Sequence, residues 1–134
     1  MADNMFKVEI ITPDRIFYTG EADFLEFNTT EGEIGVYKAH IPLTTCLAPG
    51  IVTIHEGTEE KHAAIHAGFA QILGDKVTLL AELAEWSHEI DVSRAESAKA
   101  RAEERLANRT AEVDVARAEF ALRKALIRIG AANR

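Results

Sequence analysis

Alternation of apolar and polar positions marks the first 85 residues of the chain. Phe6, Val8 and Ile10 alternate with charged neighbours, a short apolar run follows at 24–27, and alternation returns at 52–54 and 77–81. Residues that favour turns, mostly Gly and Pro, separate these segments at a spacing of roughly 8–12 residues. Short strands at this spacing are typical of an antiparallel sandwich or barrel rather than a parallel sheet with crossover helices, and we predict a β-sandwich.

The pattern becomes helical near residue 90. No Gly or Pro occurs between Asp75 and Ile129, and the tail is rich in Ala, Glu and Arg, which are strong helix formers. Asp91 is the predicted N-cap of a first helix, and a turn at 108–110 is predicted before a second. The apolar face of the second helix is predicted at Val115, Ala118, Leu122, Ala125, Leu126 and Ile129. Such alanine-rich faces bury little area, so we expect a domain at 1–85 and a weakly docked, movable hairpin at 86–134.

Composition narrows the class of protein. A chain of 134 residues, 47% hydrophobic and 28% charged, suits one small domain with an appendage and excludes a large multi-domain enzyme. Residues 1–89 carry 15 acidic and 5 basic side chains, whereas residues 90–134 carry 7 and 10, so the net charges are −10 and +3. This distribution argues against nucleic-acid binding. The N-terminus lacks the features of a signal peptide and no stretch of ~18 apolar residues occurs, so we expect no direct insertion into a membrane.

Histidine and cysteine give no strong chemical signal. On one strand His62 and His66 would lie about 13 Å apart, too far to share an ion, so we interpret these residues and His55 as exposed strand histidines. The single cysteine, Cys46, excludes an intrachain disulfide and has only His40 as a base nearby in sequence. Nothing in the chain suggests an oxyanion hole. We therefore predict no catalytic residue and no metal site.

The segment EGEIGVYKAHIPLTTCLAPG at 31–50 carries more information. Its Gly and Pro residues are explained by turns, but Glu31 and Glu33 form a tight acidic pair at a predicted loop tip, with His40 in the same segment. Exposed loops are where binding residues collect, so these three positions are candidates for an interface.

Each predicted helix also carries a basic stripe. Arg94, Arg101 and Arg105 share one face of the first, and Arg117, Lys124 and Arg128 share one face of the second. Spacing alone leaves two interpretations open. The stripes can be solvated faces whose charge nearby glutamates partly offset, which spacing favours, or they can hold an anion between them.

Together these segments resemble the epsilon subunit of bacterial F-type rotary ATP synthases. The resemblance rests on the 31–50 segment, on AGFAQI at 67–72, on VTLLAELAE at 77–85 and on the helical tail that follows. It implies a ten-stranded β-sandwich followed by an antiparallel two-helix hairpin, peripheral at the cytoplasmic face of the bacterial plasma membrane. It also implies a non-catalytic subunit of the central stalk, which couples rotation to ATP synthesis and inhibits ATP hydrolysis through mobile C-terminal helices.

Within that family, IDVSRA at 90–95 matches the ATP-binding pattern of Ile or Leu, Asp, two variable residues, Arg and Ala. No cofactor is required, but ATP is implied as a regulatory ligand. Lys124 replaces an arginine of the pattern. A lysine keeps the positive charge but cannot form the bidentate hydrogen bonds of a guanidinium group. The implied ATP contacts are Glu85, Ile90, Asp91, Arg94, Ala95, Arg101, Lys124 and Arg128.

The resemblance also implies partners. Glu31 and Glu33 would face the ring of c subunits, and His40 would lie near the gamma subunit. Fully extended, residues 90–134 would reach about 65 Å at ~1.5 Å per residue, enough to enter the catalytic head. The second helix would then contact the beta and alpha subunits through Arg117, Arg123, Lys124 and Arg128. The alternative hypothesis is a free-standing nucleotide-sensing module that uses the same hairpin.

Overall fold

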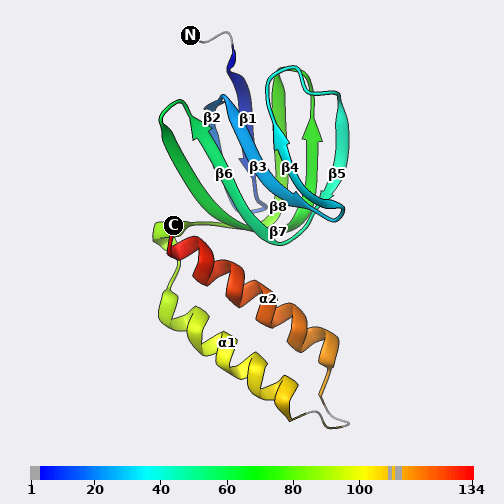
Figure 1. Cartoon of the computed structure of the whole chain (residues 1–134), viewed down its shortest axis with the longest axis vertical. Coiled ribbons are helices and arrows are strands. Elements are labelled where there is room, and N and C mark those ends of the chain that lie inside the picture. Colours follow the sequence, from blue (N-terminus) through cyan, green and yellow to red (C-terminus); the bar gives the residue numbers. More distant parts are fainter. Residues whose placement is uncertain (1–3, 109, 111–112) are drawn as a thin grey trace. The chain divides into compact units, whose positions relative to one another are not determined.

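The computed structural model describes residues 4–108, 110 and 113–134, and the chain divides into two units, Met1–Glu85 and Trp86–Arg134. From Phe6 onward, strands make up the first unit (Figure 1). They are β1 (Phe6–Ile11), β2 (Ile16–Ala22), β3 (Phe24–Thr29), β4 (Gly32–Val36), β5 (Leu43–Leu47), β6 (Gly50–Glu56), β7 (Glu59–Ile72) and β8 (Lys76–Trp86).

Hydrogen bonds join the strands in the order β2-β1-β8-β7-β5-β3-β4, and β6 pairs with both β3 and β7. The sandwich prediction is confirmed, but one neighbouring pair is parallel: β1 runs alongside β8, with Val8 opposite Val77. A parallel pair needs a long connection between its strands. Here the six intervening strands supply that connection, so no crossover helix is needed and the local sequence gives no sign of the pair.

The described residues form eight strands, not the ten that the family resemblance implied. β7 is a strand of 14 residues, the longest among those described. Its first half pairs with β6, from Glu59 to Ile65, and its second half pairs with β5, from Gly68 to Ile72. One continuous strand therefore supplies two separate ladders.

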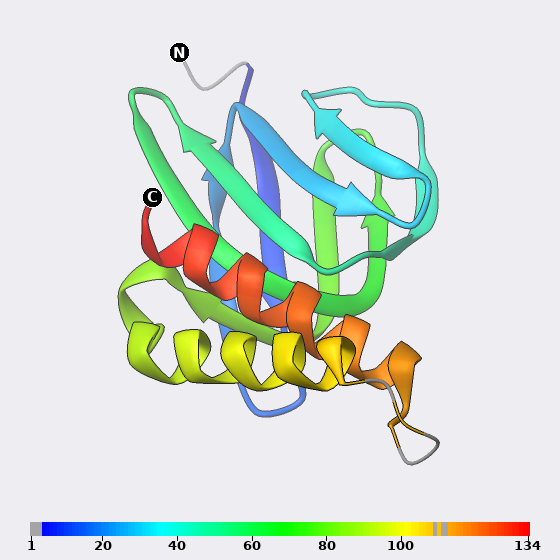
Figure 2. The same ribbon diagram turned by 60° about the horizontal axis from the view of Figure 1, so that its bottom comes forward.

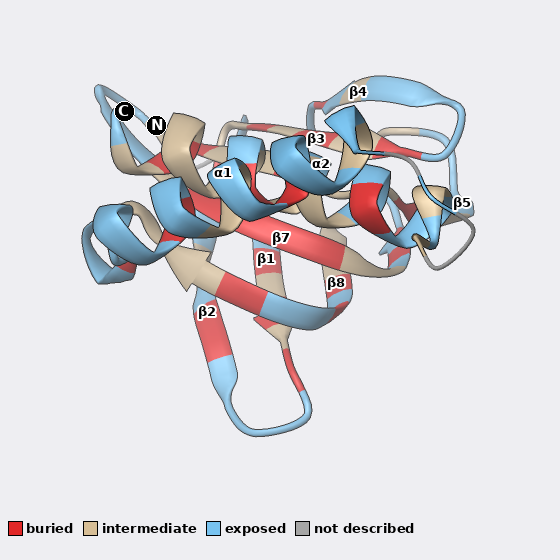
Figure 3. Ribbon diagram, turned by 90° about the horizontal axis from the view of Figure 1, so that it is seen from below, coloured by how far each residue is buried: buried red, intermediate tan, exposed pale blue. Residues whose placement is uncertain are grey.

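The core follows the predicted alternation. Val8, Ile10, Ile54 and Leu79 are fully buried, whereas Lys7 between the β1 core positions is exposed. Figure 3 shows the resulting buried stripes along β1 and β7. Burial of each such side chain contributes about 1.5–3 kcal/mol, so this unit has a substantial core of its own.

The second unit holds a short 3-10 turn, η2 (Ser87–Glu89), and two helices, α1 (Val92–Ala107) and α2 (Val115–Ala132). The two helices run antiparallel (Figure 2). Asn108 ends α1, donating its backbone N–H to the carbonyl of Glu104 at 3.0 Å. Residue 109 of the predicted turn lies outside the described residues. In the described part of the chain, neither helix is long and apolar enough to span a membrane.

The buried residues of α1 and α2 are all alanines: Ala95, Ala102, Ala118, Ala125 and Ala131. Small side chains let the helix backbones approach closely while each removes little apolar area from water. Leu126, predicted on the apolar face, is instead 47% exposed, and Phe120 is 50% exposed. The apolar face is therefore narrower than the sequence pattern indicated.

Candidate interaction and nucleotide sites

The acidic pair lies where β3 turns into β4. Thr29 holds the turn: its hydroxyl oxygen accepts the N–H of Glu31 at 3.1 Å and donates to the carbonyl of Gly32 at 2.8 Å. Gly32 has a φ of 127°, which only glycine adopts readily. Glu31 and Glu33 are both exposed, and neither carboxylate forms an ion pair with any described residue. Two unpaired negative charges are thus presented on a rigid hairpin turn.

His40 lies in the loop between β4 and β5. The N–H of Ala39 donates to the carbonyl of Gly74 at 2.7 Å, which fastens this loop to the turn before β8. The Nδ1 atom of His40 is 2.6 Å from the carbonyl oxygen of Ile41. Around it lies an exposed apolar group, here called the Ile41 surface, whose members are between 41% and 80% exposed: Tyr37, Ile41, Leu43 and Leu73.

The Ile41 surface was not predicted from the sequence. The sequence does contain a signal for this surface, because Tyr37 and Ile41 are large apolar residues in a segment without strand alternation, between Gly35 and Pro42. Tyr37 is partly supported by stacking on Phe24, with ring centroids 4.3 Å apart. Exposed apolar groups of this kind are typical of a surface that binds another protein.

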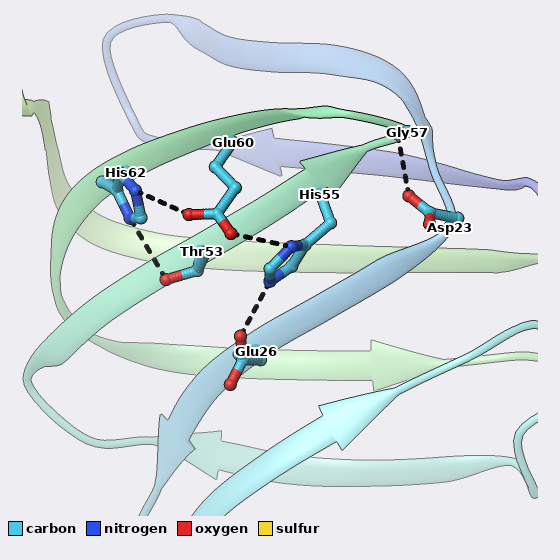
Figure 4. A network of polar contacts seen from close by, with 7 residues as sticks. All are labelled: Asp23, Glu26, Thr53, His55, Gly57, Glu60 and His62. Carbon is cyan, nitrogen blue, oxygen red and sulfur yellow. Dashed lines mark hydrogen bonds and ion pairs between the residues drawn. The ribbon is translucent and has the colours of Figure 1, made fainter.

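A chain of polar contacts crosses β3, β6 and β7 (Figure 4). His55 lies between two carboxylates, with Nε2 2.8 Å from Glu26 Oε1 and Nδ1 3.4 Å from Glu60 Oε1. Glu60 Oε2 in turn lies 3.4 Å from His62 Nε2, and His62 Nδ1 lies 3.3 Å from the Thr53 hydroxyl. These contacts tie three neighbouring strands together on the face of the sheet opposite Ile54.

The interpretation of the three histidines as exposed is therefore wrong. Their side chains are only 22%, 15% and 5% exposed at His55, His62 and His66, because neighbouring carboxylates and the sheet itself cover them. Within the described residues no three His, Cys, Asp or Glu side chains are placed to hold a metal ion.

A second polar cluster fastens β2 to the hairpin of β6 and β7. The Tyr18 hydroxyl donates to Glu56, and Lys61 Nζ lies 2.8 Å from the same carboxylate. Burial and the hydrogen-bonded Glu56 carboxylate both raise the pKa of Tyr18 above its usual value. Burial alone would raise the pKa of Glu56, but its contacts with Lys61 and Tyr18 outweigh burial and lower it.

The predicted nucleotide contacts fall at three places. Asp91 caps α1, accepting the N–H of Arg94 at 3.1 Å, and Ile90 and Ala95 are buried beside it. The other basic contacts lie further along the hairpin, Arg101 about 10 Å from Arg94 along α1, and Lys124 and Arg128 half-buried in the second half of α2. Glu85 belongs to the first unit, near the end of β8.

The antiparallel course of the helices explains which of these residues share an end of the hairpin. α1 starts where α2 finishes, so Arg94 and Arg128 both lie toward that end. At the other end, Arg105 and Arg117 line one concavity with Val113, Asp114 and Ala118. Neither Arg105 nor Arg117 forms an ion pair inside the described ranges. At this end of the hairpin, one arginine from each basic stripe thus lines the same concavity.

A sandwich with unpaired acidic residues at one turn, joined to an alanine-faced hairpin with unpaired arginines, has the features of an interacting or regulatory subunit. Two family profiles match the chain: the ATP synthase Delta/Epsilon chain beta-sandwich domain over residues 5–87, and the long alpha-helix domain of the same family over residues 88–133. The chain belongs to the ATP synthase delta/epsilon chain family.

Relatives agree over nearly the full length. The ATP synthase epsilon chain of Caldanaerobacter subterraneus subsp. tengcongensis is 42% identical over 133 residues, which cover 98% of this chain and 96% of the relative. That of Alkaliphilus metalliredigens is 47% identical over 125 residues, 93% of each chain. A chain in the cryo-EM structure of the Euglena gracilis mitochondrial ATP synthase shares the fold, with a TM-score of 0.83 at 24% identity over 97% of this chain and 82% of that one.

Proposed function

We propose that this chain is the non-catalytic epsilon subunit of a bacterial ATP synthase. It would form part of the central stalk, peripheral at the cytoplasmic face of the plasma membrane, and couple rotation to ATP synthesis. The observation that carries this proposal is the match of both family domains in order along the chain, with their junction two residues beyond the boundary between its two units. The names of the relatives support the same role.

The first unit would bind the rest of the rotor. The unpaired carboxylates of Glu31 and Glu33 suit polar, cationic groups on the ring of c subunits. The Ile41 surface beside His40 suits a packed contact with the gamma subunit, since apolar residues form the centre of stable interfaces. The first contact would weaken with salt and the second would not.

The second unit would regulate ATP hydrolysis. α2 presents Arg117, Arg123 and Lys124 along its length, with Arg128 near its end. A helix with this charge can bind an acidic segment of the beta subunit, and of the alpha subunit beside it, when the hairpin opens. Because the buried residues of α1 and α2 are small alanines, opening the hairpin would require little free energy.

ATP would be the regulatory ligand that favours the folded hairpin. Arg94 and Arg101 on α1 and Lys124 and Arg128 on α2 supply cations for phosphate, and Asp91 is fixed at the start of α1 as a helix cap. Because both helices contribute, ATP would bind the closed hairpin better than the open one and shift its population. Glu85, Ile90 and Ala95 complete the proposed site through the family's pattern.

A co-purification experiment tests the rotor role. A tagged chain should recover the gamma and c subunits, and Glu31→Gln with Glu33→Gln should weaken c-ring binding more at low salt than at high salt. His62→Gln, in the partly buried polar network, serves as the control. Recovery of the chain alone, still binding ATP, would favour a free-standing nucleotide-sensing module.

A further inference from the structure

The end of the hairpin where α1 finishes and α2 begins carries a concavity that the proposed ATP site does not use. It has a volume of about 340 Å³ and is lined by Arg105 on α1, by Val113 and Asp114 just before α2, and by Arg117 and Ala118 on α2. These five residues all belong to the second unit. Since a water molecule takes up ~30 Å³ in the liquid, the concavity has room for a small ion together with several waters.

The charge in this concavity is positive on balance. Arg105 and Arg117 contribute two guanidinium groups, and neither forms an ion pair with any residue that the structure describes. The carboxylate among the lining residues, Asp114, already accepts the backbone N–H of Arg117 at 3.0 Å as the cap of α2. A neighbouring concavity shares Arg105 and adds Arg101 and Glu104, so a third arginine lies one helical turn away. Like charges one turn apart destabilise a helix, and a bound anion would relieve their repulsion.

We propose that Arg105 and Arg117 form a binding site for a phosphate-type oxyanion at this end of the closed hairpin. A guanidinium group donates two parallel N–H bonds to two oxygens of a phosphate, so two such groups on different helices can bind one tetrahedral anion from two sides. Val113 and the buried Ala118 have apolar side chains, so recognition falls to the arginines. Two positive charges disfavour a cation in the same place.

This site is separate from the proposed nucleotide contacts. Neither Arg105 nor Arg117 is one of those contacts, and Arg105 lies 11 residues after Arg94, about 16 Å further along α1. A small oxyanion and ATP could therefore bind the same hairpin at its two ends.

A bound oxyanion would also affect the state of the hairpin. Because each helix supplies one of the two arginines, the anion would bind the closed hairpin better than the open one and shift the population toward the closed state. This consequence rests on the proposed function, in which Arg117 contacts the beta subunit after opening, since an oxyanion on Arg117 would compete with that contact. The binding site itself requires only the folded hairpin.

Titration of the full chain with inorganic phosphate at constant ionic strength tests the site, with the arginine Nε–H resonances followed by NMR. The resonances of Arg105 and Arg117 should shift together and reach saturation. Arg105→Gln and Arg117→Gln should each weaken phosphate binding at least about tenfold, because each removes a charge-assisted contact. Lys99→Gln is the control, because it removes a positive charge from α1 at a residue outside both concavities, and it should change phosphate affinity by less than about twofold.

The outcomes separate this site from the proposed ATP site. Arg105→Gln should bind ATP as tightly as the wild type, and a wild-type chain that binds phosphate but not ATP would overturn the ATP site alone. Shifts that do not saturate, or an equal loss in Lys99→Gln, would indicate general screening of a basic helix and overturn the oxyanion site. Saturation of Arg105 and Arg117 by ATP but not by inorganic phosphate would overturn it as well, because the two arginines would then bind the nucleotide.

Discussion

Asp91 and Asp114 occupy the same position in their two helices. Each precedes the first helical residue, and each carboxylate accepts the backbone N–H three residues on, from Arg94 at 3.1 Å and from Arg117 at 3.0 Å. Only Asp91 was predicted from the sequence as a cap, because the run before α2 offers several polar residues. The two caps are equivalent for helix stability, but only Asp91 belongs to the proposed ATP site.

This equivalence separates capping from ligand binding. Asp91→Ala and Asp114→Ala should each destabilise the hairpin by about 1 kcal/mol, measured as loss of helical circular dichroism on heating. Only Asp91→Ala should weaken ATP binding beyond that loss. Asp91→Asn should restore the cap, since asparagine caps as well as aspartate, without restoring the charge. Equal ATP affinity in the two alanine variants would mean that Asp91 is a cap alone.

Gly68 is predicted to be irreplaceable. Gly68→Ala combines a positive φ with a Cβ placed against the Leu80 carbonyl, and should cost the first unit at least ~2 kcal/mol in urea denaturation. Gly74→Ala is the matched control, because a Cβ there meets nothing within 4 Å and its φ is not positive. Equal stability of the two variants would show that β7 and β8 can separate at this point.

The Tyr18 hydroxyl should ionise at a higher pH than that of an ordinary tyrosine. Its folded-state pKa lies above the ordinary value of 10.0, so its contribution to stability is fully present below that pH and is lost as the pH rises above it. Ultraviolet absorbance of tyrosinate should therefore rise in two steps, the later one coinciding with unfolding of the first unit. Tyr18→Phe should remove the later step, and a single step in the wild type would contradict the buried hydrogen bond to Glu56.

The features that could be predicted from the sequence depend on local interactions. The alternation at Val8 and Ile10 and the cap at Asp91 depend on neighbours in sequence, and the structure confirms them. The parallel pairing of β1 with β8 and the covering of His55 by Glu26 and Glu60 depend on residues that only the fold brings together. The nucleotide contacts came from the IDVSRA motif, since the spacing of the arginines alone favoured a solvated face.

ATP affinity should respond to the arginines individually. An arginine–phosphate contact is a charge-assisted bond worth ~1.5–3 kcal/mol, so Arg94→Ala should weaken ATP binding by roughly ten- to a hundredfold. Lys124→Arg should tighten binding, because it restores the bidentate fork. Trp86, the single tryptophan, adjoins Glu85 in sequence and should report binding by its emission. The absence of both heat and emission change at millimolar ATP would contradict the sensing role.

In its proposed regulatory role, α2 restrains ATP hydrolysis through its basic residues. The most direct measurement is the hydrolysis rate of the reconstituted ATP synthase with the full chain, with a chain ending before Thr110, and with Arg117, Lys124 and Arg128 all changed to Ala. Subunit content of each complex should be checked first, because the first unit carries the proposed rotor contacts and should assemble in all three. We expect both altered chains to give faster hydrolysis than the full chain at equal assembly; equal rates in all three complexes would contradict the claim.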